Sequence, residues 1–192
     1  MSLAAPTTPS CVRSSNHPAC EHRARLWPGF FYWAVLTTVS FRRIESDMDE
    51  VVKYDGCFVC GDRNRIGLRA KFMSDGQQVF TEIVARDEFE GYPGIYHGGV
   101  MSALLDEVMI KAILARAIVA VTAEMTVRFV RPVRTGETIR FTARVVANKG
   151  RAYFTEGEAT GRDGQRYATA AGKYLEARSD LRARLMGALD PI

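Results

Sequence analysis

The residues best suited to chemistry lie in one stretch, Tyr96 to Glu107, with the sequence Tyr-His-Gly-Gly-Val-Met-Ser-Ala-Leu-Leu-Asp-Glu. Gly98 and Gly99 have no Cβ, so another molecule can come close to the free backbone N–H groups of a first helical turn. Those N–H groups, together with the positive end of the helix dipole, favour an oxyanion or an anion. The stretch therefore predicts a helix N-terminus that binds a carbonyl oxygen or an anion.

Two acids interrupt the apolar helix that follows. Glu107 precedes Lys111 by four residues, the favourable order for a surface ion pair, so we expect Glu107 to be a solvated charge. Asp106 has Met109 and Ile110 among its helical neighbours. A carboxylate there is either desolvated or lines a cavity, which favours a functional acid over the alternative of a buried structural one.

The elements that must hold this stretch are mostly strands. Apolar and polar residues alternate in six segments, and Asp-Gly or Asn-Lys-Gly turns connect several of them. An apolar helix from 98 to about 118 lies between the second and third segments. The pattern predicts an α+β fold with an antiparallel sheet of about five to six strands around one buried helix. The strand segments are 66–73, 78–86, 121–129, 139–145, 151–160 and 165–174.

Composition bounds the functional class. The chain has 192 residues, of which 47% are hydrophobic and 25% charged, and its formal net charge is +4. These values are ordinary for a globular protein, and no basic run is dense enough to predict nucleic-acid binding. The four cysteines are too unevenly spaced for a disulfide framework, so we expect a reducing compartment, the cytoplasm.

Residues 1–47 differ in composition from the rest of the chain. Their aromatic run, Phe30 to Phe41, is shorter than the roughly 18 to 20 apolar residues that a spanning helix needs, so no membrane span is expected. The segment is interpreted as a poorly ordered extension, an interfacial anchor or an over-long gene prediction whose true start is Met48. We therefore expect a globular domain over 48–176 and a short helix or frayed tail over 177–192.

The motif Cys57-Phe-Val-Cys60-Gly could be half of a zinc site or a redox pair. A structural zinc site normally has four ligands, and no second CxxC follows. A thioredoxin-type pair needs a helix N-terminus between two strands, which is missing here. The sequence favours two small residues in a tight turn, with zinc as the minority alternative, so we predict no metal site.

Several short motifs together resemble one protein family. They are His97-Gly98-Gly99 with Asp106 nine residues after the histidine, then Met125-Thr-Val-Arg-Phe129, Arg131-Pro132-Val133 and Gly136, and upstream the CxxC-Gly motif with Asn64 and Gly67-Leu68. From about 57 to 175 this set resembles the PaaI-type, phenylacetate-pathway branch of the hot-dog acyl-CoA thioesterases, in the 4-hydroxybenzoyl-CoA thioesterase superfamily. The resemblance implies a hot-dog fold and hydrolysis of an acyl-CoA to a free acid and CoA, without metal or redox cofactor.

The resemblance also implies roles for single residues. The Gly98 N–H polarises the thioester carbonyl, Asp106 is the general base or the nucleophile, and Thr122 helps to position the attacking water. His97 is a structural or orienting residue, and with Gly99 it belongs to the substrate-binding end of the helix.

A geometric argument predicts an oligomer. The helical rise of 1.5 Å per residue places Asp106 about 12 Å along the axis from Gly98. One reacting carbon, however, must lie about 3 Å from both the nucleophile and the oxyanion donor. Gly98 of one subunit must then face Asp106 of another, so we expect a homodimer, and two dimers could pair further. The basic residues near strand ends and turns, which suit CoA phosphates, are Arg128, Arg131, Arg134, Lys149 and Arg151.

Three other classes remain open. A non-catalytic acyl-CoA-binding hot-dog protein would fit the loop before the motif, where relatives often carry Asn or Gln and this chain has Glu90-Gly91; the retained Asp106 argues against it. A hydratase or dehydratase would need a catalytic histidine paired with an acid, which His97 beside two glycines does not match. A zinc-stabilised interaction module built on Cys57 and Cys60 would contain bound zinc.

Overall fold

The computed structural model describes residues 48–189 of the chain. The predictions made for residues 1–47 lie outside this range. The described part contains two α-helices, α1 (Gly98–Leu114) and α2 (Ser179–Met186), and neither is long and apolar enough to cross a membrane. Helix α2 lies within the segment predicted to be a short helix or frayed tail.

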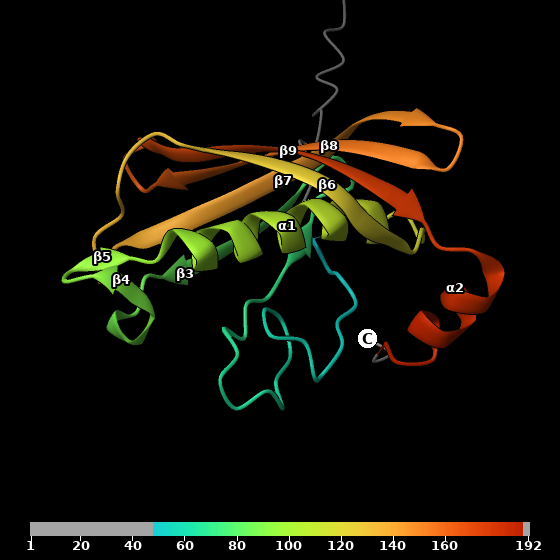
Figure 1. The fold of residues 1–192 in the computed structure, drawn as a ribbon, viewed down its shortest axis with the longest axis horizontal. Coiled ribbons are helices and arrows are strands. Elements are labelled where there is room, and N and C mark those ends of the chain that lie inside the picture. The colour runs from blue at the N-terminus through green and yellow to red at the C-terminus, as the bar shows by residue number, and fades with distance from the viewer. Residues whose placement is uncertain (1–47, 190–192) are drawn as a thin grey trace, which may run out of the picture. The chain divides into compact units, whose positions relative to one another are not determined.

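A seven-stranded antiparallel sheet forms the main layer (Figure 1). The two short strands of the sheet pair with each other near the N-terminal edge, and the longest four follow α1 in the chain. A separate pair, β4 and β5, precedes α1 after a short 3-10 turn, η1 (Asp87–Phe89). The strand order is β1 (Asp49–Glu50), β2 (Met73–Ser74), β3 (Val79–Val84), β7 (Thr138–Lys149), β8 (Ala152–Gly161), β9 (Arg166–Glu176) and β6 (Ala120–Phe129), and the separate pair is β4 (Glu90–Tyr92) and β5 (Ile95–Tyr96).

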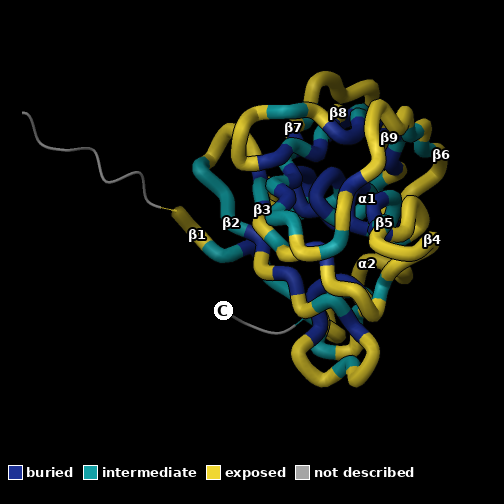
Figure 2. The backbone as a smooth tube through the Cα atoms, turned by 90° about the vertical axis from the view of Figure 1, so that its left-hand side faces the viewer, coloured by how far each residue is buried: buried dark blue, intermediate teal, exposed yellow. Residues whose placement is uncertain are grey.

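Helix α1 lies against one face of this sheet and is the centre of the core (Figure 2). In β7 the side chains of Ile139, Phe141 and Ala143 point to the helix and are buried, while the residues between them face the other way. Leu104 and Leu105 of α1 are fully buried. The alternation in the strands and the apolar helix thus predict the observed α+β architecture, because each buries the surface that the other leaves exposed.

Helix α1 ends earlier than the predicted position near 118. The backbone of Ala117 has a φ of 59°, and its N–H donates to the Leu114 carbonyl at 2.8 Å. A left-handed residue after the last turn ends a helix, and glycine is the usual signal for it. An alanine in this position gives no such signal in the sequence.

The strand predicted over 66–73 is largely absent. Only Met73 and Ser74 pair as a strand, and Arg69 has a φ of 55°, which interrupts the extended run. The N–H groups of Leu68 and Ala70 instead donate to the carbonyls of Phe58 and Val59, both at 2.9 Å. Residues 51–72 therefore form an irregular loop that packs against α1 on the side away from the sheet, and we call this segment the 51–72 loop (Figure 1).

Candidate functional site

The N-terminus of α1 offers one free backbone donor. The N–H of Gly99 donates to Nδ1 of His97 at 2.8 Å, and the N–H groups of Val100 and Met101 donate to the His97 carbonyl at 3.0 and 3.1 Å. Within residues 48–189, only the Gly98 N–H of this turn has no acceptor. The prediction that both glycine N–H groups are free is therefore wrong for Gly99 and holds for Gly98.

Two glycines make room for the His97 ring. A Cβ on Gly99 would lie 2.9 Å from the ring, and one on Gly91 would lie 3.0 Å from it. At Gly98, by contrast, a Cβ would meet only the Phe129 ring at 3.5 Å, an ordinary contact. His97 is thus a cap that orients the first turn, which agrees with the structural role that the resemblance implies.

The Asp106 carboxylate lies where α1 meets strands β6 and β9. Its Oδ1 accepts the hydroxyl of Thr122 at 2.9 Å and the hydroxyl of Tyr174 at 2.9 Å. Its Oδ2 lies 3.2 Å from the Thr122 oxygen. Because the Thr122 hydroxyl has one proton, which it donates to Oδ1, its hydrogen bond to Oδ2 is weak. The structure therefore brings Asp106 and Thr122 together, and Oδ2 is the oxygen with the weaker hydrogen bonding.

Tyr174 is a site residue that the sequence reasoning missed. Its side chain is fully buried, and burial raises the pKa of its hydroxyl, as does the Asp106 charge. It therefore remains a hydroxyl donor over the whole ordinary pH range. Gly172 makes room for its ring, since a Cβ there would lie 2.5 Å from the Tyr174 ring. In the sequence, a tyrosine two residues after a glycine in a predicted strand indicates a ring that needs room, but it does not identify Asp106 as the partner.

Gly98 and Asp106 do not converge within one chain. Both lie on α1, eight positions apart, and the helical rise separates them by about 12 Å. A single thioester carbonyl cannot reach both groups at once.

Glu107 is not the surface charge that its spacing to Lys111 predicts. The ion pair exists, with Oε1 3.6 Å from the Lys111 Nζ, but the exposed fractions of the two side chains are only 17% and 4%. The 51–72 loop covers both of them, and Lys111 also donates to the Val52 carbonyl. Burial raises the pKa of Glu107, and Lys111 opposes the shift.

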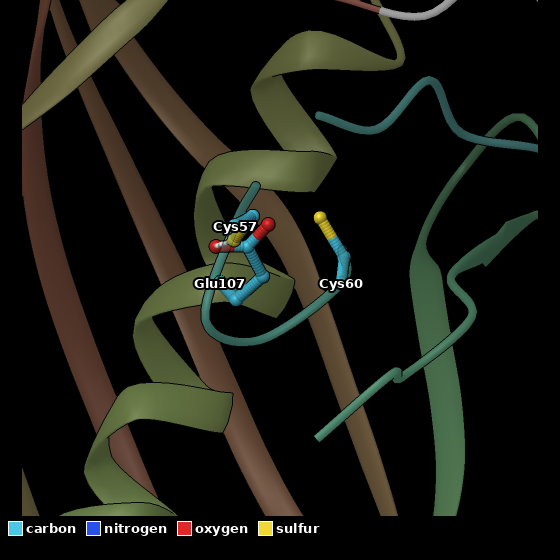
Figure 3. A group of neighbouring side chains, drawn as sticks. All are labelled: Cys57, Cys60 and Glu107. Carbon is cyan, nitrogen blue, oxygen red and sulfur yellow. Dashed lines mark hydrogen bonds between the residues drawn. The ribbon is translucent and has the colours of Figure 1, made fainter. Parts of the chain in front are cut away.

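The other neighbours of Glu107 are the two cysteines of the CxxC motif. Figure 3 shows the three side chains gathered where the loop passes over α1. Cys57 Sγ lies 3.8 Å from Oε2 of Glu107. A hydrogen bond from Cys60 lowers the pKa of the Cys57 thiol, backbone N–H groups and Lys111 lower it further, and the same pairing raises the pKa of Cys60.

The basic residues expected to bind CoA phosphates do not form one patch. Arg128 lies near the end of β6, where it pairs with Thr169, and Arg131 follows in the next turn. Arg151 donates to the Glu176 carbonyl, which lies beside the first residue of β6, and Lys149 is close to it in the β7–β8 hairpin. Eight strand residues, about 27 Å, separate the two groups.

A hollow among the described residues lies away from both Asp106 and Gly98. It measures about 620 Å³ and is lined by side chains on the sheet face opposite α1, among them Arg128, Arg144 and Glu156. Neither Asp106 nor Gly98 borders it. It is a concave sheet surface, two of whose arginines pair with Glu156 and Glu158, and is not the Asp106 site.

The loop before α1 is stabilised by a hydrogen bond between two of its own residues. The Glu90 carboxylate accepts the N–H of Gly94 at 2.8 Å. In the position where the resemblance leads us to expect an amide, this chain therefore has a carboxylate that closes a turn.

Comparison with known proteins agrees with this geometry. Residues 93–168 match the family model described as thioesterase superfamily. Among solved structures, a thioesterase superfamily protein is 25% identical with a TM-score of 0.59, over 64% of this chain and 61% of that one. The chain thus spans less than two thirds of that protein's length. No curated protein matches the sequence.

Two further structures share the fold. The Escherichia coli PaaI protein from the phenylacetic acid degradation operon is 21% identical with a TM-score of 0.51, over 53% of this chain and 73% of its own. Zebrafish thioesterase superfamily member 2 is 21% identical with a TM-score of 0.53, over 56% and 81%. The fold is the hot-dog fold, as predicted. The match of residues 93–168 to the thioesterase superfamily model, together with the shared fold, supports the resemblance to PaaI-type hot-dog thioesterases.

Proposed function

We propose that this chain hydrolyses an acyl-CoA thioester to a free carboxylic acid and CoA. The observation that carries the proposal is the Asp106 carboxylate, held by the hydroxyls of Thr122 and Tyr174 on a helix that is mostly apolar. Both hydroxyls fix Oδ1, so Oδ2 is left to accept a proton. A carboxylate fixed in this way can act as a general base toward water.

The reaction follows from this arrangement. Oδ2 of Asp106 takes a proton from a water, the water oxygen attacks the thioester carbonyl, and the Gly98 N–H donates to the oxyanion that forms. The C–S bond then breaks, and the leaving CoA thiolate takes the proton from Asp106. Direct attack by Asp106, with water opening the resulting anhydride, is the alternative.

Strand β6 supports a site shared between two copies. It is the edge of the sheet, and Val121, Phe129 and Val130 expose large apolar side chains along it or just after it. Such an edge favours pairing with a second chain. Thr122 marks the Asp106 end of β6, and Phe129, next to Gly98, marks the other end.

The positions of these markers define a register. If two copies of β6 pair antiparallel about an axis between Met125 and Thr126, Thr122 of each lies opposite Phe129 of the other. This pairing brings Asp106 of one copy toward Gly98 of its partner, as one carbonyl requires. A homodimer with two equivalent sites is therefore part of the proposal.

Ligands bound to proteins with the same fold support CoA as a part of the substrate. One from Streptococcus mutans is bound to acetyl-CoA, and a thioesterase from Streptococcus pneumoniae is bound to coenzyme A. The latter was also solved as two alanine variants, of an aspartate and of a threonine 16 positions apart. The same spacing separates Asp106 and Thr122.

Thiol release from acyl-CoA tests the proposal. Asp106→Asn keeps the acceptor for both hydroxyls but removes the charge, and we expect hydrolysis to fall about 10³-fold. Gly98→Pro removes the N–H without disturbing the helix, because proline fits a first helical position and the extended His97 before it. We expect a loss of about 10²-fold. Gly98→Ala, which keeps the N–H, should lose far less, and the exposed Asp180→Asn is the distant control.

Mixing the two inactive variants tests the shared site. In a heterodimer of Asp106→Asn and Gly98→Pro, one of the two sites combines an intact Asp106 with an intact Gly98. Random mixing should therefore restore roughly a quarter of the parent activity. Absence of any recovery in co-expressed, mixed dimers would refute the shared site, and an Asp106→Asn protein as active as the parent would refute the role of the carboxylate.

A further inference from the structure

We propose that Cys57, Cys60 and Glu107 bind one zinc ion, at a site separate from Asp106. The sulfur and oxygen atoms of the three side chains lie within 4.8 Å of one another. In a tetrahedral zinc site, ligand bonds of about 2.0 to 2.3 Å place such atoms roughly 3.5 to 3.8 Å apart. Cys57 Sγ and Glu107 Oε2 are already 3.8 Å apart, so an ion fits after small side-chain movements (Figure 3).

The backbone of the CxxC turn holds its two sulfurs on one side. The Val59 N–H donates to Cys57 Sγ at 3.3 Å, and the Gly61 N–H donates to the Cys57 carbonyl at 3.0 Å. Gly61 is required there, because a Cβ would lie 2.2 Å from the Asp55 carbonyl oxygen. A donor to a ligand sulfur orients it and stabilises its anionic form, as outer partners of metal ligands do.

The Glu107 carboxylate divides its two oxygens between the sulfurs and a cation. Oε2 faces Cys57, and Oε1 faces Lys111, whose Nζ is 3.6 Å away. Two thiolates and a carboxylate carry three negative charges, which a zinc ion and the Lys111 ammonium together balance. This neutrality lowers the cost of burying a charged cluster beneath the 51–72 loop.

The donor set selects the metal. Thiolates prefer zinc to magnesium or calcium, and a two-residue spacer between cysteines is usual for zinc ligands. Three protein ligands leave a fourth position for water. Since two ligands lie in the loop and the third in α1, the ion would tie an irregular loop to the central helix, in addition to buried side chains such as Val59 and Phe72.

Metal content of the purified full-length chain tests the proposal. The protein is produced in zinc-supplemented medium, its affinity tag is removed, and zinc is counted by mass spectrometry. We expect about one zinc per chain, none in Cys57→Ser/Cys60→Ser, and about 100-fold weaker zinc binding in Glu107→Gln, measured by competition with a chromophoric chelator. Asp106→Asn and Cys11→Ser/Cys20→Ser are the matched controls and should keep the zinc.

Two further measurements guard against variants that misfold. Circular dichroism checks that each variant keeps its sheet, and hydrogen exchange of the parent should become faster in the 51–72 loop when a chelator removes the ion. A parent protein without zinc, whether its CxxC thiols are free or joined in a disulfide, would overturn the proposal. Zinc retained at parental affinity by Glu107→Gln, or lost from Cys11→Ser/Cys20→Ser, would overturn this set of ligands.

Discussion

Two neighbouring acids of one helix lie in opposite surroundings. Asp106 faces strands β6 and β9, where two neutral hydroxyls hold its carboxylate. Glu107, about 100° further round the helix, lies under the 51–72 loop among two thiols and an ammonium group. As adjacent acids of one helix, the two residues look equivalent in the sequence. Their surroundings differ because different elements pack on the two sides of α1.

The difference lies in what each set of partners does to the charge. Hydroxyl donors orient a carboxylate but leave its full negative charge, which a general base needs. The Lys111 ammonium neutralises Glu107 and, by being buried with it, makes that side of the helix a structural joint. A carboxylate on α1 that accepts from hydroxyls is thus suited to catalysis, and one that pairs with an ammonium group is suited to binding the loop.

Of the changes that test this difference between the two acids, moving the Asp106 charge should have the largest effect, and it should act on the rate of hydrolysis. Asp106→Glu keeps the carboxylate but extends it by one methylene, which shifts the oxygens by more than 1 Å. Because such a displacement costs about 10²-fold, we expect thiol release from acyl-CoA to fall by that factor, about 2.7 kcal/mol. Activity within a few-fold of the parent would mean that a charge on this face is sufficient and that the hydroxyls do not define its position.

Removing the Lys111 charge should have the next largest effect, on stability. Lys111→Met leaves Glu107 without its cation, and we expect the free energy of unfolding to fall by about 2 kcal/mol. This is less than the 3–5 kcal/mol of a fully buried pair, because 17% of the Glu107 side chain is exposed. Urea unfolding in the presence of a chelator measures it.

A double-mutant cycle separates the charge from other losses. Lys111→Met also removes a donor to the Val52 carbonyl, but it does so equally in the parent and in Glu107→Gln. Lys111→Met should therefore cost about 1 kcal/mol less in the Glu107→Gln background. Equal costs in both backgrounds would show that Lys111 does not neutralise Glu107.

Much of the fold could be predicted from local patterns. Alternation, an Asn-Lys-Gly turn and an Asp-Gly turn predict β7, β8 and β9, and apolar content predicts α1, because each of these signals lies within a few residues. The resemblance to a family also assigns Asp106 and Thr122 to one site, and the structure shows the hydrogen bond between them. The prediction of a strand over 66–73 is wrong because the backbone of Arg69 is left-handed, and an arginine does not indicate that conformation in the sequence as a glycine would.

The surroundings of the two acids could not be predicted in the same way. Spacing along α1 shows that Lys111 is near Glu107, but the 51–72 loop that buries them lies about 50 positions away, as the Cys57 contact shows. Tyr174 reaches Asp106 from 68 positions away, through the pairing of β9 with β6. Contacts of this kind depend on how distant elements pack, which no local pattern contains.

Removing either hydroxyl on Asp106 should have a smaller effect than the Asp106→Glu or Lys111→Met change, and one that separates catalysis from stability. Thr122→Val keeps the shape of the exposed threonine, and we expect kcat to fall about 10-fold, with KM and stability nearly unchanged. Tyr174→Phe removes a buried donor to a carboxylate, so we expect a similar loss of kcat together with about 1.5 kcal/mol of stability. Steady-state kinetics and urea unfolding on both variants separate the two roles. If Thr122→Val lost stability but not kcat, the hydroxyls would serve only to pack α1 against the sheet, and the Asp106 side of the helix would be a structural joint like the Glu107 side.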